Sequence, residues 1–193
     1  VEDMLGTLVT IAKDVKIQIF FNPKTVAGWR LIGYENRLLR KQDFNDDTKD
    51  AGEIGAGHAV TALYELVPAG TELPGPKVDP NPFVEEPKPV ETVDETALFR
   101  LRLRYKAPQG DVSTLIEEDV HDQGVRFFET DKDVQWAGAV AAFGMLLRDS
   151  PYKGLSTYPL VEEIAQASRG EDRRGYRAEF VRLVRLAQTL SGQ

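Results

Sequence analysis

Apolar and polar residues alternate with a period of two through the first two thirds of the chain, a pattern that predicts β-strands. In residues 15–21 (VKIQIFF), the odd positions are apolar and form the face that we expect to be buried. In residues 97–108 an apolar row is set against a basic row, which we expect to be solvated or to meet acidic loops. Further strands are predicted over residues 27–39, 60–68 and 111–120, with a short one over 124–129.

From residue 130 onwards the period of the pattern changes to 3.6, which predicts helices. The first helix, over residues 131–148, starts at a capping-box-like Thr130 and is apolar nearly all round, so we expect it to be buried. A second helix begins at Thr157 and is closed by Gly170. The acidic Asp172 suits the positive end of a third helix.

Strands precede helices along the chain, and this order is typical of an α+β fold. We predict a β-sandwich-like antiparallel domain over residues 15–129, followed by a C-terminal three-helix subdomain over residues 130–193 that packs on it. Residues 69–95 are rich in proline and acids and are expected to form a long surface excursion between two strands. Helical spacing in residues 1–14 predicts the end of a helix whose packing partner lies in an upstream domain.

Composition narrows the possible classes of function. The 193 residues carry 24 basic and 31 acidic side chains, and the net charge of −7 opposes phosphate binding, so we expect no nucleic acid partner. The most apolar run, residues 134–147, is shorter than the roughly 20 residues that a membrane span needs. The absence of cysteine excludes disulfides, thiol catalysis and cysteine-ligated zinc.

An acidic, glycine-rich segment over residues 43–58 holds the candidate site residues. Its carboxylate and imidazole groups suit calcium or zinc, which makes Asp46, Asp47, Glu53 and His58 a candidate metal site. The spacing does not match an EF-hand, and a strand follows the glycines where a phosphate-binding loop requires a helix. A solvated acidic loop is the simpler interpretation. As a partner-binding surface, the segment would contribute Asp43, Asp46, Asp47, Asp50, Glu53 and His58.

No catalytic constellation is recognisable in the sequence, so we expect no catalytic residue and no cofactor. The chain contains neither GxSxG nor HExxH. The adjacent acids Glu117 and Glu118 diverge on a strand, and Glu162 and Glu163 diverge on a helix, so neither pair forms an acid–base dyad. The arginine-rich side of the third helix would suit an acidic partner, although such faces are more often solvated.

Four long segments together resemble a known family. They are IQIFFNPKTVAGWRLIGYENR, DFNDDTKDAGEIGAGHAVTALYELVP, WAGAVAAFGMLLRDSPYKG and GYRAEFVRLVRLA. In this order they resemble the uncharacterised C-terminal domain of bacterial YfbK-like proteins, which contain a von Willebrand factor type A domain. The resemblance covers nearly all of residues 1–193 and is interrupted mainly by residues 69–95.

The resemblance implies an upstream von Willebrand factor A domain in the same chain, of which residues 1–14 would be the last helix. The Asp-x-Ser-x-Ser motif of that domain's metal site is absent here, so the metal site is not carried over. Family members often carry export or lipoprotein signals, which implies a cell envelope or periplasmic location. No catalytic residue follows from the resemblance.

Two functions are compatible with these observations. The first is a non-enzymatic interaction or scaffolding module that accompanies the adhesion domain and binds a protein partner, as yet unidentified, through residues 43–58 and 69–95. The alternative is a calcium- or zinc-dependent hydrolase, or a metal-binding domain, that uses residues 43–58. A stoichiometric metal in the purified protein would distinguish the second from the first.

Overall fold

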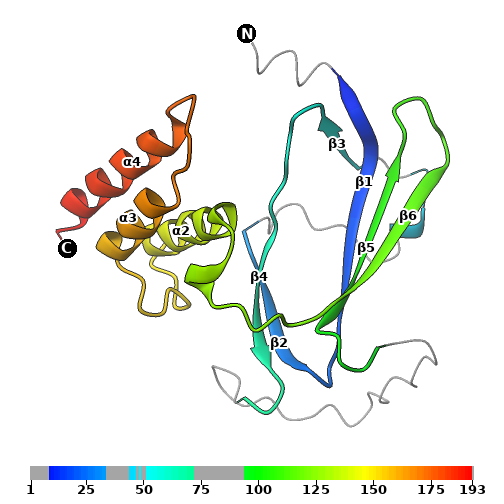
Figure 1. Cartoon of the computed structure of the whole chain (residues 1–193), viewed down its shortest axis with the longest axis horizontal. Coiled ribbons are helices and arrows are strands. Elements are labelled where there is room, and N and C mark those ends of the chain that lie inside the picture. Colours follow the sequence, from blue (N-terminus) through cyan, green and yellow to red (C-terminus); the bar gives the residue numbers. More distant parts are fainter. Residues whose placement is uncertain (1–8, 34–43, 47, 49–50, 72–93, 193) are drawn as a thin grey trace. The chain divides into compact units, whose positions relative to one another are not determined.

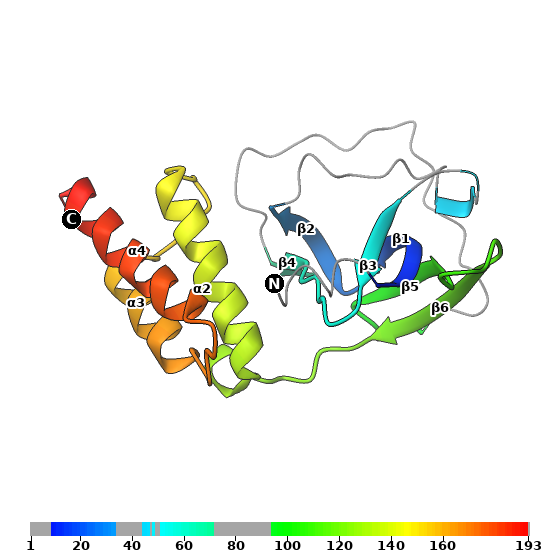
Figure 2. The ribbon, with the colours of Figure 1, turned by 90° about the horizontal axis from the view of Figure 1, so that it is seen from above.

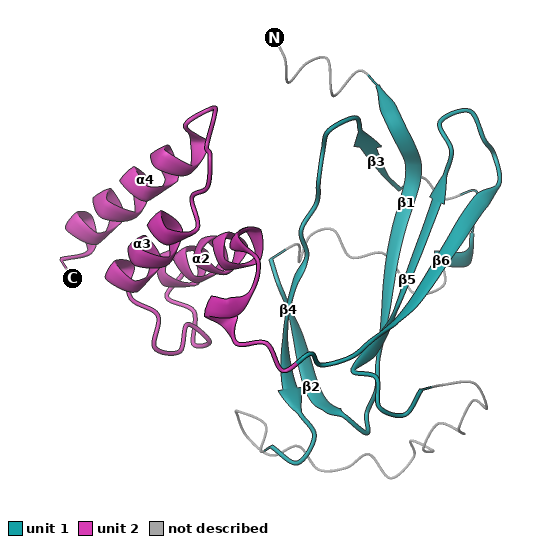
Figure 3. Cartoon of the chain, viewed as in Figure 1, with its two compact units in different colours: residues 1–123 teal, residues 124–193 magenta. Residues whose placement is uncertain are grey.

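The computed structural model describes residues 9–33, 44–46, 48, 51–71 and 94–192. Strands come first along the chain and helices follow (Figures 1 and 2), which confirms the predicted α+β fold. The chain divides into two compact units, residues 1–123 and residues 124–193 (Figure 3). The boundary therefore falls after residue 123, whereas the prediction placed it after residue 129. No helix in the described part of the chain combines the length and apolar character needed to span a membrane.

Unit 1 contains two antiparallel sheets, one of four strands in the order β3-β1-β5-β6 and one that pairs β2 with β4. The strands are β1 (Thr10–Phe21), β2 (Val26–Ile32), β3 (Gly52–Gly55), β4 (Leu63–Pro68), β5 (Phe99–Lys106) and β6 (Ser113–Val120). β5 and β6 form the predicted hairpin, in a register that runs from Phe99 opposite Val120 to Lys106 opposite Ser113. This register decides which charged side chains meet across the hairpin.

β1 begins at Thr10, so the helix predicted for residues 1–14 is wrong for residues 10–14; residues 1–8 lie outside the described residues. The reason is that this segment pairs with strands on both sides, with Thr10 opposite Gly55 of β3 and Lys13 opposite Lys106 of β5. Pairing with two strands supplies the backbone N–H and C=O groups with hydrogen-bond partners as fully as a helix does. The stabilisation from this pairing outweighs the weak helical preference that a few apolar residues confer.

The alternation predicted for β1 and β5 is confirmed by their register, which places Ile17 opposite Leu103 and Gln18 opposite Arg102. The expected burial of the apolar row is only partly correct, because Ile17 is 48% exposed whereas Lys16 on the polar face is 3% exposed. Lys16 is buried because Phe44 and its neighbours lie over that face. Its Nζ donates to the backbone carbonyl of Asp46 in the covering segment.

Four aromatic rings connect the two sheets of unit 1. Phe21 of β1 stacks on Trp29 of β2, with ring centroids 4.6 Å apart and an interplanar angle of 22°. The rings of Tyr64 and Phe99 lie 5.6 and 5.7 Å from Phe21. These contacts attach β2 and β4 to one end of the larger sheet, while the face-to-face layering of a sandwich stays a prediction.

Unit 2 consists of the three predicted helices, α2 (Lys132–Leu147), α3 (Tyr158–Ala167) and α4 (Tyr176–Ser191). Both α2 and α4 pack on α3. The centre of this core is formed by Ala139, Val161, Ala165 and Val184, which are all 0% exposed. Aromatic rings extend the core, with Phe143 of α2 in edge-on contact with Phe180 of α4 at 5.3 Å.

The residue predicted at the start of each helix is confirmed for α3 and α4 but not for α2. Thr157 accepts a hydrogen bond from the backbone N–H of Leu160, and Asp172 accepts from those of Arg177 and Ala178. Asp131, rather than Thr130, caps α2, because its side chain accepts from the Asp133 backbone N–H.

The expectation that α2 is buried all round is wrong. Within this helix only Gln135 and Ala139 are buried, whereas Val134 is 46% and Leu147 is 58% exposed. The apolar residues of α2 that face α3 and α4, such as Phe143, pack on the core, whereas those on its outer side are exposed.

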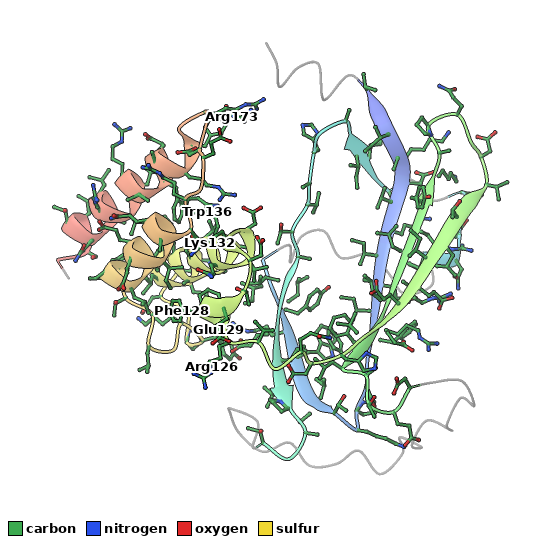
Figure 4. All side chains as sticks on the ribbon, viewed as in Figure 1. Arg126, Phe128, Glu129, Lys132, Trp136 and Arg173 are labelled. Carbon is green, nitrogen blue, oxygen red and sulfur yellow. The ribbon has the colours of Figure 1, made fainter. Side chains whose placement is uncertain are left out.

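The short strand predicted over residues 124–129 is also wrong, since Phe127–Glu129 form a 3₁₀ turn, η3. The Phe127 ring lies over Gly138 of α2, where an added Cβ would be only 2.8 Å from the ring. The Gln135 side chain donates to the backbone carbonyls of Phe128 and Thr130, and Figure 4 shows Phe128 and Glu129 beside the start of α2. Packing against a helix therefore replaces sheet pairing in this segment.

Candidate functional site

A cleft of about 430 Å³ opens at the end of the larger sheet, where β1 runs into the turn at Asn22 and Pro23. Three phenylalanines contribute its apolar part, and charged side chains of β5 and β6 form much of the rest. The phenylalanines are Phe20, Phe21 and Phe99, and the charged residues are Asp94, Arg100, Arg102, Glu117 and Asp119. Apolar surface with a few converging polar groups is the usual character of a binding site.

Asn22 fixes one wall of this cleft. Its side-chain amide donates to the backbone carbonyls of Glu95 at 3.0 Å and Ala97 at 2.8 Å. The Thr25 hydroxyl donates to the same Ala97 carbonyl at 2.8 Å. Residues far apart in sequence are thereby joined, and Asp94 is held at the mouth of the cleft.

The charged groups of β5 and β6 hold one another across the hairpin. Arg100 binds Asp119 through two hydrogen bonds, Nε to Oδ1 at 2.6 Å and Nη2 to Oδ2 at 2.7 Å. Arg102 Nε lies 3.1 Å from Glu117 Oε1. The hydrogen bonds from Arg100 lower the pKa of Asp119, so this carboxylate stays ionised at neutral pH. Such paired groups form a fixed polar rim and are poor proton donors.

Asp94, which also lines the cleft, belongs to a small network of its own. Its Oδ1 accepts hydrogen bonds from the Thr96 hydroxyl at 2.7 Å and the Thr96 backbone N–H at 2.9 Å. Its Oδ2 lies 2.9 Å from Nε2 of His121. The bonds from Thr96, followed by the His121 contact, lower the pKa of Asp94 to about 2. A general acid or base near neutral pH would need the opposite shift, so this carboxylate is suited to accepting hydrogen bonds.

The described part of the acidic segment lies beside the cleft. Phe44 is 1% exposed, and its ring centroid is 5.2 Å from the guanidinium carbon of Arg102 and 5.9 Å from that of Arg104. The same Arg102 carbon lies 5.9 Å from the ring centroid of Phe20 in the cleft. The basic row of β5 therefore contacts the acidic segment. This agrees with the expectation that these side chains are either solvated or in contact with acidic loops.

The predicted metal residues do not form a metal site among the residues that the structure describes. Asp46 Oδ1 accepts from the hydroxyl and backbone N–H of Thr48 at 2.6 and 2.9 Å, which closes a local turn. Glu53 Oε2 accepts from the Thr10 hydroxyl at 3.4 Å, and the His58 backbone N–H donates to Gly55. Nowhere in the described segments do three His, Asp or Glu side chains group to hold a metal ion. Asp43, Asp47 and Asp50 lie outside the described residues.

Sequence reasoning missed the cleft. The ion pairs of the cleft could have been predicted from the sequence. The arginine row of β5 and the acids of β6 are separated by a short turn, so a hairpin brings them together. The contact between Asp94 and His121 could not have been predicted, since only the folded chain brings these distant residues together.

Comparison with known proteins places the chain in a family. The family model described as "Uncharacterized protein YfbK, C-terminal" matches residues 6–190. The chain is 40% identical over 185 residues to "Uncharacterized protein YfbK" of Escherichia coli (strain K12); the match covers 96% of this chain and 31% of that relative. No solved structure matches it. The resemblance noted in the sequence is confirmed, and the chain belongs to the family of YfbK C-terminal domains.

Proposed function

We propose that this domain is a non-enzymatic protein-binding module whose binding site is the cleft of unit 1. The supporting observation is that one described residue of each acidic segment of the sequence lies at the cleft. Phe44, from the first segment, contacts Arg102 in the lining, and Asp94, at the end of the second, belongs to the lining itself. A partner that enters the cleft would therefore meet described residues from both segments that the sequence marked as interaction surfaces.

The chemistry of the lining supports a protein ligand. Phe20 is 48% exposed and offers an apolar surface for one anchoring side chain of a partner. The rim around it is polar, and its ion pairs fix the geometry before binding, which reduces the entropy lost on association. We infer that an apolar or aromatic residue of the partner inserts beside Phe20 while polar groups around it bind the rim.

In the wider protein, we propose that the module accompanies a von Willebrand factor type A domain in the cell envelope. The family resemblance supports this setting. The relative from Escherichia coli is much longer than the matched region, which covers 31% of it, and this length supports a multidomain protein.

Photo-crosslinking from one residue of the cleft tests the proposed site. Benzoylphenylalanine is placed at Phe20 of the intact protein in living cells, and adducts are identified by mass spectrometry. The matched control is Ile116, which is 50% exposed where Phe20 is 48% exposed and lies on the other face of the sheet. We expect a discrete protein adduct from position 20 and none from position 116. Equal adducts from both positions, or none from position 20, would show that the cleft is not the binding site.

A further inference from the structure

The charges that line the cleft do not all cancel, because three carboxylates stand against two guanidinium groups. Arg100 is paired with Asp119 through two hydrogen bonds. Arg102 is paired with Glu117, at 3.1 Å. Within the described lining, Asp94 is therefore the carboxylate without an arginine or lysine of its own. A cleft with one negative charge in excess favours a ligand that carries a cation.

The groups around Asp94 do not supply this cation. The carboxylate accepts from the hydroxyl and backbone N–H of Thr96 and contacts Nε2 of His121. A histidine, unlike an arginine or a lysine, carries no permanent charge at neutral pH. The neighbouring carboxylate Glu95 has a partner of its own, since its Oε1 lies 2.6 Å from Nζ of Lys24. Among the described residues, His121 is thus the group that would compete with a ligand cation for Asp94.

Asp94 is open to such a ligand. Its side chain is 45% exposed and belongs to the lining of the cleft. An ionised carboxylate has about four acceptor positions, and the two bonds from Thr96 with the contact to His121 leave a position on Oδ2. Because the Thr96 bonds, followed by the His121 contact, lower its pKa to about 2, Asp94 is ionised at neutral pH. It therefore offers a fixed, charged acceptor.

The apolar part of the cleft lies close to this acceptor. Asn22 connects the two, because it follows Phe20 by two residues and donates to the carbonyl of Glu95, next to Asp94. Lysine and arginine combine a long apolar stem with a charged head. One such side chain can cover phenylalanine surface and still reach a carboxylate, whereas an acidic side chain would be repelled by Asp94.

We propose that the cleft selects a basic residue of its partner, whose ammonium or guanidinium group binds Oδ2 of Asp94 while its stem packs towards Phe20. The inference rests on the proposed function, because it names the ligand chemistry of the same cleft. Charge-assisted hydrogen bonds are stronger than neutral ones, so this contact discriminates between partners. The recognised segment carries a lysine or arginine within a few residues of the apolar or aromatic anchor.

Capped tripeptides test this selection on the whole chain. Three probes share a phenylalanine and a glycine spacer and differ in the third residue, which is lysine, glutamine or glutamate. NMR follows binding through the Thr96 amide signal and the Asp94 carboxyl ¹³C signal. We expect the lysine peptide to bind at least roughly fivefold more tightly than the glutamine peptide, with a preference that salt weakens, and the glutamate peptide to bind least.

Four variants assign the preference to Asp94. Asp94→Asn should lower the affinity for the lysine peptide at least roughly fivefold and leave that for the glutamine peptide within about twofold. Glu95→Gln is the matched control, because this adjacent carboxylate is 68% exposed and paired with Lys24, and it should keep the preference. His121→Lys places a permanent cation beside Asp94 and should remove the preference, whereas the neutral His121→Gln should keep it. The substituted side chains are all at least 38% exposed, so circular dichroism should show an unaltered fold.

Three results would overturn the proposal. They are equal binding of the lysine and glutamine peptides, a preference that survives in Asp94→Asn, and a lysine peptide that leaves the Thr96 and Asp94 signals unmoved. The proposed function fails on a different observation, the absence of photo-crosslinked adducts from position 20. Adducts from position 20 without a preference for lysine would keep the cleft as a binding site and remove its selection of a basic residue.

Discussion

Asp14 fastens three segments of unit 1 with one side chain. It lies at an irregularity in the pairing of β1, where its φ angle is +53°, a value that aspartate tolerates better than most residues. Its Oδ2 lies 2.7 Å from Nζ of Lys106 on β5, and its Oδ1 accepts from the Ala51 backbone N–H at 3.2 Å. The two side chains of the ion pair are only 17% and 10% exposed.

Replacing Asp14 should destabilise unit 1 strongly, because Lys106, whose side chain is 10% exposed, would lose this carboxylate partner. We expect Asp14→Ala to lower the free energy of unfolding by about 3 kcal/mol in urea denaturation. Asp111→Ala is the matched control, since Asp111 is 99% exposed and 3.7 Å from Lys13, and it should cost less than about 0.5 kcal/mol. Similar losses in the two variants would show that the Asp14 pair has no special weight.

Asp94 should titrate well below an ordinary aspartate. Its pKa is lowered from 3.8 to about 2, so its stabilising contribution is present above pH 3.8 and is lost as the pH falls towards 2. The carboxyl ¹³C shift in an NMR titration measures this midpoint directly. Because the Thr96 bonds are the larger cause, Thr96→Ala should return the pKa closer to 3.8 than His121→Ala does. The reverse order would contradict the assigned cause.

Among the helices, Arg177 joins all three α-helices of unit 2. Its guanidinium carbon lies 4.8 Å from the ring centroid of Trp136 on α2, and its Nη2 forms an ion pair with Asp133. Its Nη1 donates to the carbonyls of Ser168 and Arg169 at the end of α3, at 3.0 and 3.3 Å. The guanidinium of this α4 residue thus caps the end of α3 and stacks on the Trp136 ring of α2.

Replacing Arg177 should destabilise unit 2 more than replacing an exposed arginine of the same helix. We expect Arg177→Met to lower the free energy of unfolding by about 2 kcal/mol, whereas Arg182→Met, at a side chain 75% exposed, should change it by less than about 0.5 kcal/mol. Helical circular dichroism during denaturation reports the loss, because the described α-helices all lie in unit 2. Equal effects of the two substitutions would contradict the role given to Arg177.

At the element level, the period of the sequence pattern predicted most strands and all three helices. It failed where tertiary contacts outweighed local spacing. Residues 10–14 joined β1 because β3 and β5 offer ladder partners on both sides. Phe127 lies in a 3₁₀ turn instead of the predicted strand, because its ring packs over Gly138, which has no side chain. Lys16 is buried because a segment distant in sequence covers it, and no local pattern contains that information.

For the whole molecule, the division into two units predicts that unit 2 folds alone. Residues 124–193 enclose their own core, in which Ala139, Val161 and Val184 are 0% exposed. A chain of these residues is small but within the size at which single domains still fold. We expect its far-ultraviolet circular dichroism to show the three helices and a cooperative thermal transition. A chain of residues 124–193 without helical signal would contradict this division.

The candidate site was predictable only in part. The acidic segments were visible in composition, and Phe44 and Asp94 show that their described ends reach the cleft. The cleft itself depends on the register of β5 with β6 and on the bonds from Asn22 to residues more than 70 positions away. Such contacts arise from the topology of the chain, which a single sequence does not display.

Within the described part of the chain, β6 is an outer strand of the larger sheet, and this position has a consequence for solubility. An open edge strand offers unpaired backbone groups on which further copies can assemble into aggregates. β6 carries Glu117, Glu118 and Asp119 in succession, so an antiparallel pairing of two such edges would bring carboxylates against carboxylates. We therefore expect the acids that shape the cleft also to oppose edge-to-edge aggregation.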